Sequence, residues 1–296
     1  MTTSPPTPAP PREGEGKEPL RLPTTLLGAE VGPCEQAIDA RWLMAYAAAL
    51  GERDARYFDT ETPAGPAAHP LFPVCYEWPP AVALRERAIG EAIAPRSVHA
   101  THDLVIHRPP RAGDRLTTRA RIVEVRPLAA GSLVVGRYDT TDATGALVTT
   151  THYGSIYRGV SCDGTAAPRS PAPPDRGPVL WTEDVTIGAG LAHVYTECAR
   201  IWNPIHTDVA VAHAAGLPGL ILHGTATLAL AVSRVVTREL GGDPARVRGV
   251  SARFTGMVPM PSTVTLRGYD TAGTEIPFDV VDAAGRPVLG RGVVTR

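Results

Sequence analysis

The sequence lacks an excess of charge of either sign. Its 296 residues include 29 Lys and Arg against 30 Asp and Glu, and no block of basic residues occurs. A nucleic-acid-binding surface needs clustered Lys and Arg to neutralise phosphates, so we expect no nucleic-acid partner. Long apolar runs are also missing. None approaches the ~20 residues that a membrane-spanning helix requires, so we expect no membrane partner.

Cysteine is scarce, and the few copies are scattered. Cys34, Cys75, Cys162 and Cys198 form no CxxC pair and no Cys/His ligand spacing. The sequence therefore predicts neither a disulfide framework nor a zinc site, and we expect no metal and no other cofactor. Residues 1–20 lack the apolar centre of a secretory signal, and a reducing cytoplasm is the expected location.

Two stretches without a hydrophobic period divide the chain. Residues 1–20 are rich in proline and charge and are expected to form a disordered tail. Residues 161–178 are dominated by Pro, Gly and Ser, which indicates a linker. The predicted units are residues 21–160 and 179–296. Because 43% of the chain is hydrophobic, each unit is expected to have its own core.

The two units are faint copies of each other. The segment Tyr46–Asp59 aligns without gaps on Tyr195–Asp208, which places Tyr57 opposite His206. The turn sequence DATG that begins at Asp142 also matches the sequence DAAG at residues 282–285. Such a repeat indicates one supersecondary unit that occurs twice.

Each copy is predicted to contain helices followed by strands. In the C-terminal copy, residues 224–240 are apolar over most of the helix circumference, which predicts a buried central helix. Its strands are expected at residues 247–258, 262–269, 275–281 and 288–295. The N-terminal copy is expected to have helices at residues 38–50 and 79–93, and strands at residues 98–106, 116–125, 132–141 and 146–157. An antiparallel meander that wraps a buried helix is the α+β hotdog layout. We therefore expect a double hotdog with two antiparallel sheets.

The segment from Asn203 to Gly224 contains the candidate chemistry. Pro204 is poorly tolerated inside a helix, so His206 is expected on a loop, where its side chain can point into a cleft. His223 and Gly224 begin the buried helix, and a glycine there lets a ligand approach the free N–H. A reaction at the carbon atoms alpha and beta to a thioester carbonyl needs at least one base and one oxyanion donor.

The motifs NPIH at residues 203–206 and ILHG at residues 221–224 resemble the hydratase motif of the MaoC-like family, which includes the (R)-specific enoyl-CoA hydratases. The resemblance covers essentially the whole chain outside the tail and the linker, and it implies the double-hotdog fold. It implies that His206 is the catalytic histidine and that Asn203, the motif asparagine, belongs to the same catalytic set. It also implies that the Gly224 N–H polarises the thioester carbonyl.

Members of this family have an aspartate at the position of Ile201, and an isoleucine cannot move a proton. Glu197 lies one helical turn earlier and could reach the cleft, although Arg200 offers it an ordinary ion pair. Asp208 could orient the catalytic imidazole, or it could cap the next helix. Glu52 occupies the repeat position of Ile201, but it is expected at the opposite, degenerate site.

Further residues are expected around the cleft. Trp202 is expected in the core or in the pocket wall, and Tyr195 shares a packing position with Tyr46 of the first copy. His223 is expected to bond the backbone near the helix start, with ligand contact as the alternative. The predicted substrate-binding set is Ile201, Trp202, His223, Tyr195 and Glu197.

The N-terminal copy lacks both the donor glycine and the histidine base. The resemblance implies that it is a binding half, with room for a long or bulky acyl group beneath the helix predicted over residues 79–93. His99, His102 and His107 are spaced by three and five residues along one predicted strand. This spacing predicts side chains on both faces of the strand, in solvated or interface positions.

Three functions are compatible with these residues. The first is hydro-lyase action on a 3-hydroxyacyl or 2-enoyl thioester carried by CoA or an acyl carrier protein. The second is an isomerisation, an addition by a nucleophile other than water, or a cyclisation, because Ile201 makes the site drier. The third is a non-catalytic acyl-thioester binding protein or partner subunit. Because hotdog units commonly pair, a homodimer is expected, with a self-sufficient monomer as the alternative.

Overall fold

The computed structural model describes residues 20–164, 176–270 and 273–296. Apart from Leu20, the tail predicted over residues 1–20 lies outside the described residues. Most of the linker predicted over residues 161–178 also lies outside them. Within the described ranges, no helix is both long and apolar enough to cross a membrane.

The two copies share five strands and two main helices in the same order, and the C-terminal copy has one additional short helix, α4. The N-terminal copy has strands β1 (Glu30–Ala37), β2 (Ser97–Ile106), β3 (Arg115–Leu128), β4 (Gly131–Thr141) and β5 (Leu147–Arg158), and helices α1 (Ala40–Ala49) and α2 (Pro73–Ala88). The C-terminal copy has strands β6 (Val179–Ile187), β7 (Gly249–Phe254), β8 (Ser262–Tyr269), β9 (Glu275–Asp282) and β10 (Pro287–Thr295), and helices α3 (Leu191–Ala199), α4 (Val209–Ala214) and α5 (Gly224–Glu239).

The described strands form one ten-stranded antiparallel sheet in the order β1-β3-β4-β5-β2-β7-β10-β9-β8-β6. The α+β class is confirmed, but the prediction of two separate sheets is wrong. β2 pairs with β7, from Thr101 opposite Arg253 to Val105 opposite Gly249. This pairing removes two sheet edges whose N–H and C=O groups would otherwise lack partners.

The sequence predicts eight of these strands to within a few residues and misses β1 and β6. Both are the outermost strands of the sheet, and their side chains are largely exposed or half-buried. A strand with so few buried positions has only a weak alternation of apolar and polar residues. The prediction that each copy begins with a helix is therefore wrong, because a strand comes before it.

The two central helices pack on opposite halves of the sheet, α2 on β1 and β3, and α5 on β9 and β10. The predicted buried helix at residues 224–240 is confirmed as α5. The helix predicted at residues 79–93 begins earlier than expected, at Pro73, because proline fits the first position of a helix. Pro79 and Pro80 lie inside α2, where packing against the sheet outweighs their poor helix propensity.

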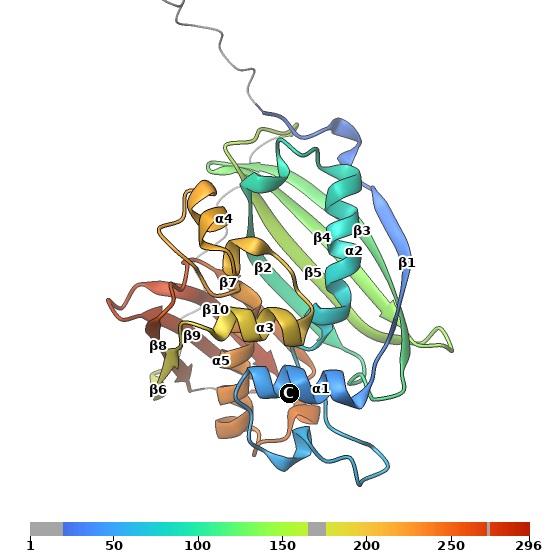
Figure 1. Ribbon diagram of the computed structural model, residues 1–296, viewed down its shortest axis with the longest axis vertical. Helices are drawn as coiled ribbons and strands as arrows, with labels where there is room; N and C mark the ends of the chain where they lie inside the picture. The colour runs from blue at the N-terminus through green and yellow to red at the C-terminus, as the bar shows by residue number, and fades with distance from the viewer. Residues whose placement is uncertain (1–19, 165–175, 271–272) are drawn as a thin grey trace, which may run out of the picture.

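The repeat is visible where α1 and α3 lie side by side (Figure 1). The Tyr46 and Tyr195 hydroxyls are 3.4 Å apart and the ring centroids 5.7 Å apart, both side chains being fully buried. The Trp42 indole N–H also donates to the Cys198 carbonyl oxygen at 3.1 Å. The shared packing role predicted for the two tyrosines is confirmed, and it ties the two copies together.

Candidate functional site

The loop after α3 positions His206. α3 ends at Ala199, and Arg200 closes it in the left-handed conformation with φ of 59°. The next short 3-10 helix, Pro204–His206, begins after Asn203, whose side-chain oxygen accepts the Ile205 N–H at 3.5 Å. Pro204 is the first residue of that turn, where its missing N–H costs nothing. His206 thus lies outside the α-helices, in a short 3-10 turn between α3 and α4, which confirms the predicted loop position.

The His206 imidazole is held from two sides. Its Nδ1–H donates to the Ile221 carbonyl oxygen at 2.8 Å, since a carbonyl can only accept. Its ring also stacks on that of His223, with centroids 3.7 Å apart and planes 29° from parallel. The proton on Nδ1 leaves the Nε2 lone pair available to accept another proton. Burial lowers the pKa of His206 to about 4, so the ring is neutral near pH 7.

Gly224 is the first residue of α5, directly after His223. The first N–H groups of a helix have no partner within the helix, so the Gly224 N–H is a ready hydrogen-bond donor. A β-carbon at position 224 would lie 3.1 Å from the ring of Phe254. Because His206 stacks on the residue that precedes Gly224, the base and the donor belong to one small region.

Helix α3 fixes the start of α5 through two buried hydrogen bonds. The Tyr195 hydroxyl donates to Thr225 Oγ1 at 3.1 Å, and Thr196 Oγ1 bonds His223 Nε2 at 3.2 Å. Burial, with a smaller contribution from the neighbouring His206, lowers the pKa of His223 to about 2. The predicted structural role of His223 is thus supported, although its Nε2 partner is a threonine side chain and not the backbone.

No carboxylate pairs with His206 among the described residues. Ile201, at the position where the family resemblance implies an aspartate, is only 4% exposed. Glu197 is exposed, and in the described structure it makes no ion pair with Arg200, whose guanidinium lies 3.9 Å from the Trp42 ring centroid. The expected Glu197–Arg200 pair is therefore wrong.

Asp208 caps a helix, and Trp202 lies at the surface. The Asp208 side chain accepts the N–H groups of Ala210 and Val211, which confirms its role as the N-cap of α4. Trp202 is 60% exposed, so the interpretation that it belongs to the core is wrong. The loop after α3 turns its indole toward solvent, and the sequence pattern alone does not reveal that turn.

The surroundings of Glu52 include a histidine that the repeat does not predict. Glu52 Oε1 lies 3.8 Å from Nε2 of His69, and the same Nε2 bonds Ser233 Oγ of α5 at 3.1 Å. Tyr57, the repeat partner of His206, stacks on His69 with centroids 6.1 Å apart. Glu52 thus belongs to the degenerate site, as expected, and the imidazole there comes from a segment outside the repeat alignment.

The prediction of a solvated position is also wrong for His102, because this side chain is fully buried. A register shift occurs between His99 and Thr101 in the pairing of β2 with β5. An extra residue in a strand lets side chains at an odd spacing reach the same face. His99 and His102 accordingly have ring centroids only 5.8 Å apart.

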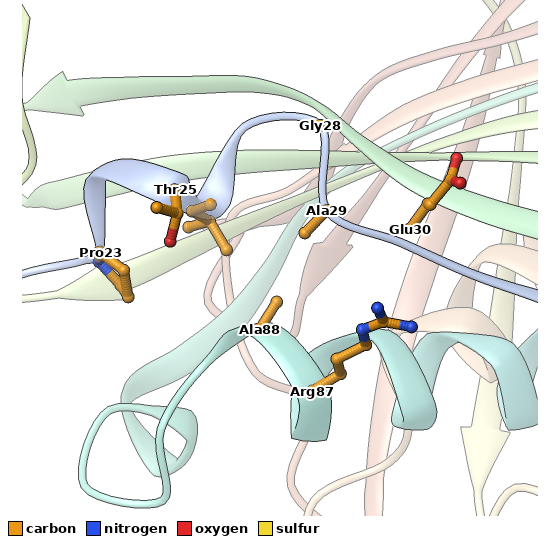
Figure 2. A pocket seen from close by; sticks show the side chains of 8 residues that line it. Pro23, Thr25, Gly28, Ala29, Glu30, Arg87 and Ala88 are labelled. Atoms are coloured by element: carbon orange, nitrogen blue, oxygen red, sulfur yellow. The ribbon is translucent and has the colours of Figure 1, made fainter.

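A surface hollow lies away from these residues (Figure 2). It measures about 370 Å³ and is bounded by the segment before β1 and by the C-terminal end of α2. Its lining includes Pro23, Gly28, Glu30 and Arg87, and no residue of the His206–Gly224 region belongs to it. We assign it no part in the chemistry.

Comparison with known families identifies both copies. Residues 178–281 match the family model described as MaoC like domain. The C-terminal half is a MaoC-like dehydratase domain. Residues 25–151 match the model described as FAS1-like, dehydratase domain region, so the N-terminal half is also dehydratase-like. The predicted family resemblance is confirmed.

Known structures share the double arrangement. A MaoC-like dehydratase from Phytophthora capsici superimposes with a TM-score of 0.79 over 91% of this chain and 95% of its own, at 22% identity. Peroxisomal multifunctional enzyme type 2 of Drosophila melanogaster gives a TM-score of 0.73 over 90% of this chain and 48% of its own, at 26% identity. Another neighbour is described as having a double hotdog fold. The predicted double-hotdog layout is therefore confirmed, with the two halves joined in one sheet.

The relatives known by sequence include enoyl-CoA hydratase ChsH3 of Mycobacterium tuberculosis, which is 29% identical over 62% of this chain and 64% of its own length. The matched relatives also include much larger proteins, of which this chain spans as little as 3%. The chain thus spans less than two thirds of the length of these relatives.

Proposed function

We propose that this protein is a hydro-lyase that interconverts a 2-enoyl thioester and a 3-hydroxyacyl thioester, carried by CoA or an acyl carrier protein. The main support is that His206, with a free Nε2, stacks on the residue before Gly224 at the start of α5. The mycobacterial relative is named as an enoyl-CoA hydratase, which agrees with this chemistry.

In the dehydration direction, the thioester oxygen accepts a hydrogen bond from the Gly224 N–H. Nε2 of His206 removes the proton from C2, and the oxygen bound to Gly224 gains negative charge. The electron pair then forms the C2–C3 double bond while the C3–O bond breaks. His206 returns its proton to the departing hydroxyl, which leaves as water. Hydration is the reverse, and a single base serves both proton transfers.

The two halves have different roles in this proposal. The MaoC-like half supplies the base and the oxyanion donor, whereas the N-terminal half, with Tyr57 in place of the catalytic histidine, binds the acyl group. Asn203 shapes the turn that precedes His206. The substrate-binding roles of Ile201, Trp202, His223, Tyr195 and Glu197, a homodimer and a cytoplasmic location stay predictions from the sequence.

The buried Ile201 favours one alternative, a reaction without water. An apolar side chain where relatives have an acid suits isomerisation, a different nucleophile or a cyclisation. Incubation of the full chain with a 2-enoyl-CoA in H₂¹⁸O separates these reactions. We expect one ¹⁸O atom at C3 of the product, measured by mass spectrometry. Conversion without ¹⁸O would support the alternative, and binding without conversion of any enoyl-CoA tested would indicate a non-catalytic binding protein.

The pH profile provides a further test. His206 accepts a proton only when neutral, and burial holds its pKa at about 4, although the bond to Ile221 acts in the opposite direction. Hydration kcat/KM should therefore stay level as the pH falls through the ordinary histidine range near 6.5 and should drop only as it approaches about 4. Initial rates after brief exposure to each pH check this. An acidic limb centred near the ordinary value would contradict the assigned environment of His206.

A further inference from the structure

The interior of the N-terminal half contains polar atoms that lack partners in the described structure. Glu77 on α2 is 1% exposed and His102 on β2 is 0% exposed. Glu77 Oε2 and both ring nitrogens of His102 have no hydrogen-bond partner among the described residues. Buried polar groups are costly when unpaired, so these three atoms require an explanation.

His102 and the threonine that bonds Glu77 occupy nearby positions on one face of the sheet. His102 is the cross-strand partner of Tyr153 on β5, and the two rings have centroids 4.9 Å apart. Thr151 lies two residues before Tyr153, so it points to the same face. Its hydroxyl donates to Glu77 Oε1 at 2.7 Å, which joins α2 to this face.

A row of rings leads from this cluster to the proposed active site. Phe254 would contact a β-carbon placed on Gly224. Its ring centroid lies 4.3 Å from that of His99, and His99 stacks on Tyr153 at 4.0 Å. An acyl chain whose thioester is held at Gly224 can therefore follow this row toward Glu77 and His102.

Both groups are electrically neutral near pH 7. Burial raises the pKa of Glu77 to about 8, although the hydroxyls of Thr151 and Thr149 act in the opposite direction. Because Oε1 accepts from Thr151, the acid proton belongs on Oε2, which can then donate. Burial lowers the pKa of His102 to about 3, which leaves one ring nitrogen as donor and the other as acceptor. Together they match an uncharged oxygen atom of a ligand.

We infer that Glu77 and His102 select an acyl thioester whose chain has a hydroxyl or carbonyl group beyond C3, over a plain alkyl chain. The inference rests on the proposed function, since it places the acyl group in the N-terminal half. A site built to hydrogen-bond an oxygen discriminates against the analogue without it, because its buried polar groups then stay unpaired.

The experiment compares 2-enoyl-CoA substrates whose acyl chains have equal length. One substrate has a plain alkyl chain, and each of the others has a single hydroxyl group at a different position along the chain. For the best-placed hydroxyl, we expect kcat/KM to exceed that of the alkyl substrate by roughly tenfold, the effect of one buried hydrogen bond. In Glu77→Leu the ratio should fall to about one, whereas Glu77→Gln, which keeps a donor, should retain part of it. Glu86→Gln, an exposed position on the same helix, is the matched control and should behave as wild type.

A ratio near one at every hydroxyl position, unchanged in Glu77→Leu, would overturn the inference while leaving the hydro-lyase function intact. If no enoyl-CoA is converted, the same comparison is made by calorimetric binding of saturated hydroxyacyl- and alkyl-CoA. A hydroxyl preference that Glu77→Leu removes would then support the inference without the proposed function, and equal affinities would overturn it. Should Glu77→Leu fail to fold, Glu77→Gln and His102→Leu are measured in its place.

Discussion

Replacing His206 by alanine is expected to lower hydration kcat/KM by about 10²–10⁴-fold, the usual effect of one general base. The substitution removes Nε2 of His206, the ring nitrogen proposed as the general base beside the start of α5. His206→Asn is the sharper variant, because its amide N–H can still reach the Ile221 carbonyl, which accepts the Nδ1–H at 2.8 Å in the native protein. It should lose nearly as much activity as alanine while it retains more of the local structure.

The control for this experiment is His213→Ala, because His213 lies on α4 and is exposed. It should have native activity. Thermal unfolding of each variant shows whether the fold survives the substitution. Hydration at the native rate by a folded His206→Ala protein would eliminate the proposed mechanism.

Gly224→Pro is the second substitution with a large expected effect. Proline fits the first position of a helix, and His223, with φ of −57° and ψ of 137°, has the extended conformation that a residue before proline prefers. The variant therefore keeps α5 but deletes the N–H proposed to bind the thioester oxygen. Removal of one oxyanion donor typically costs about 10²–10³-fold in kcat, and we expect a loss of that size.

Gly224→Ala separates the lost donor from the added bulk. Alanine keeps the N–H and introduces only a β-carbon, 3.1 Å from the Phe254 ring. The ring must shift by a few tenths of an ångström, so a modest loss of activity is expected. Equal losses in the alanine and proline variants would assign the effect to crowding and would contradict the role of the N–H.

The site that these variants test was predicted in part from local sequence. Proline after Asn203 places His206 on a turn, and the apolar run after His223 predicts a buried helix that starts at Gly224. Both features depend on residues close together in the chain, so they can be inferred without the fold. The contact between His206 and His223 could not, because it joins a loop and a helix start that approach each other only after α3 packs on α5.

The fate of the missing acid also depended on tertiary structure. The family resemblance implies an aspartate at the position of Ile201, and the sequence offers Glu197 and Asp208 as substitutes. Glu197 is exposed and Asp208 caps α4, and neither pairs with the imidazole among the described residues. A carboxylate four residues along a helix shares a face with its neighbour, but that rule does not say which face meets the cleft.

The sequence by itself determined the α+β class, the internal repeat, eight of the strands and the buried helix α5, because each of these depends on the periodicity of nearby residues. Only the tertiary structure decided that the two copies share one sheet, since the pairing of β2 with β7 joins strands far apart in the chain. It alone also revealed the cluster around Glu77 and His102. A strand irregularity places His102 in the core, where the sequence pattern predicts a solvated or interface position. Glu77 lies in α2 before its two internal prolines, outside the residues that the sequence pattern predicts to be helical.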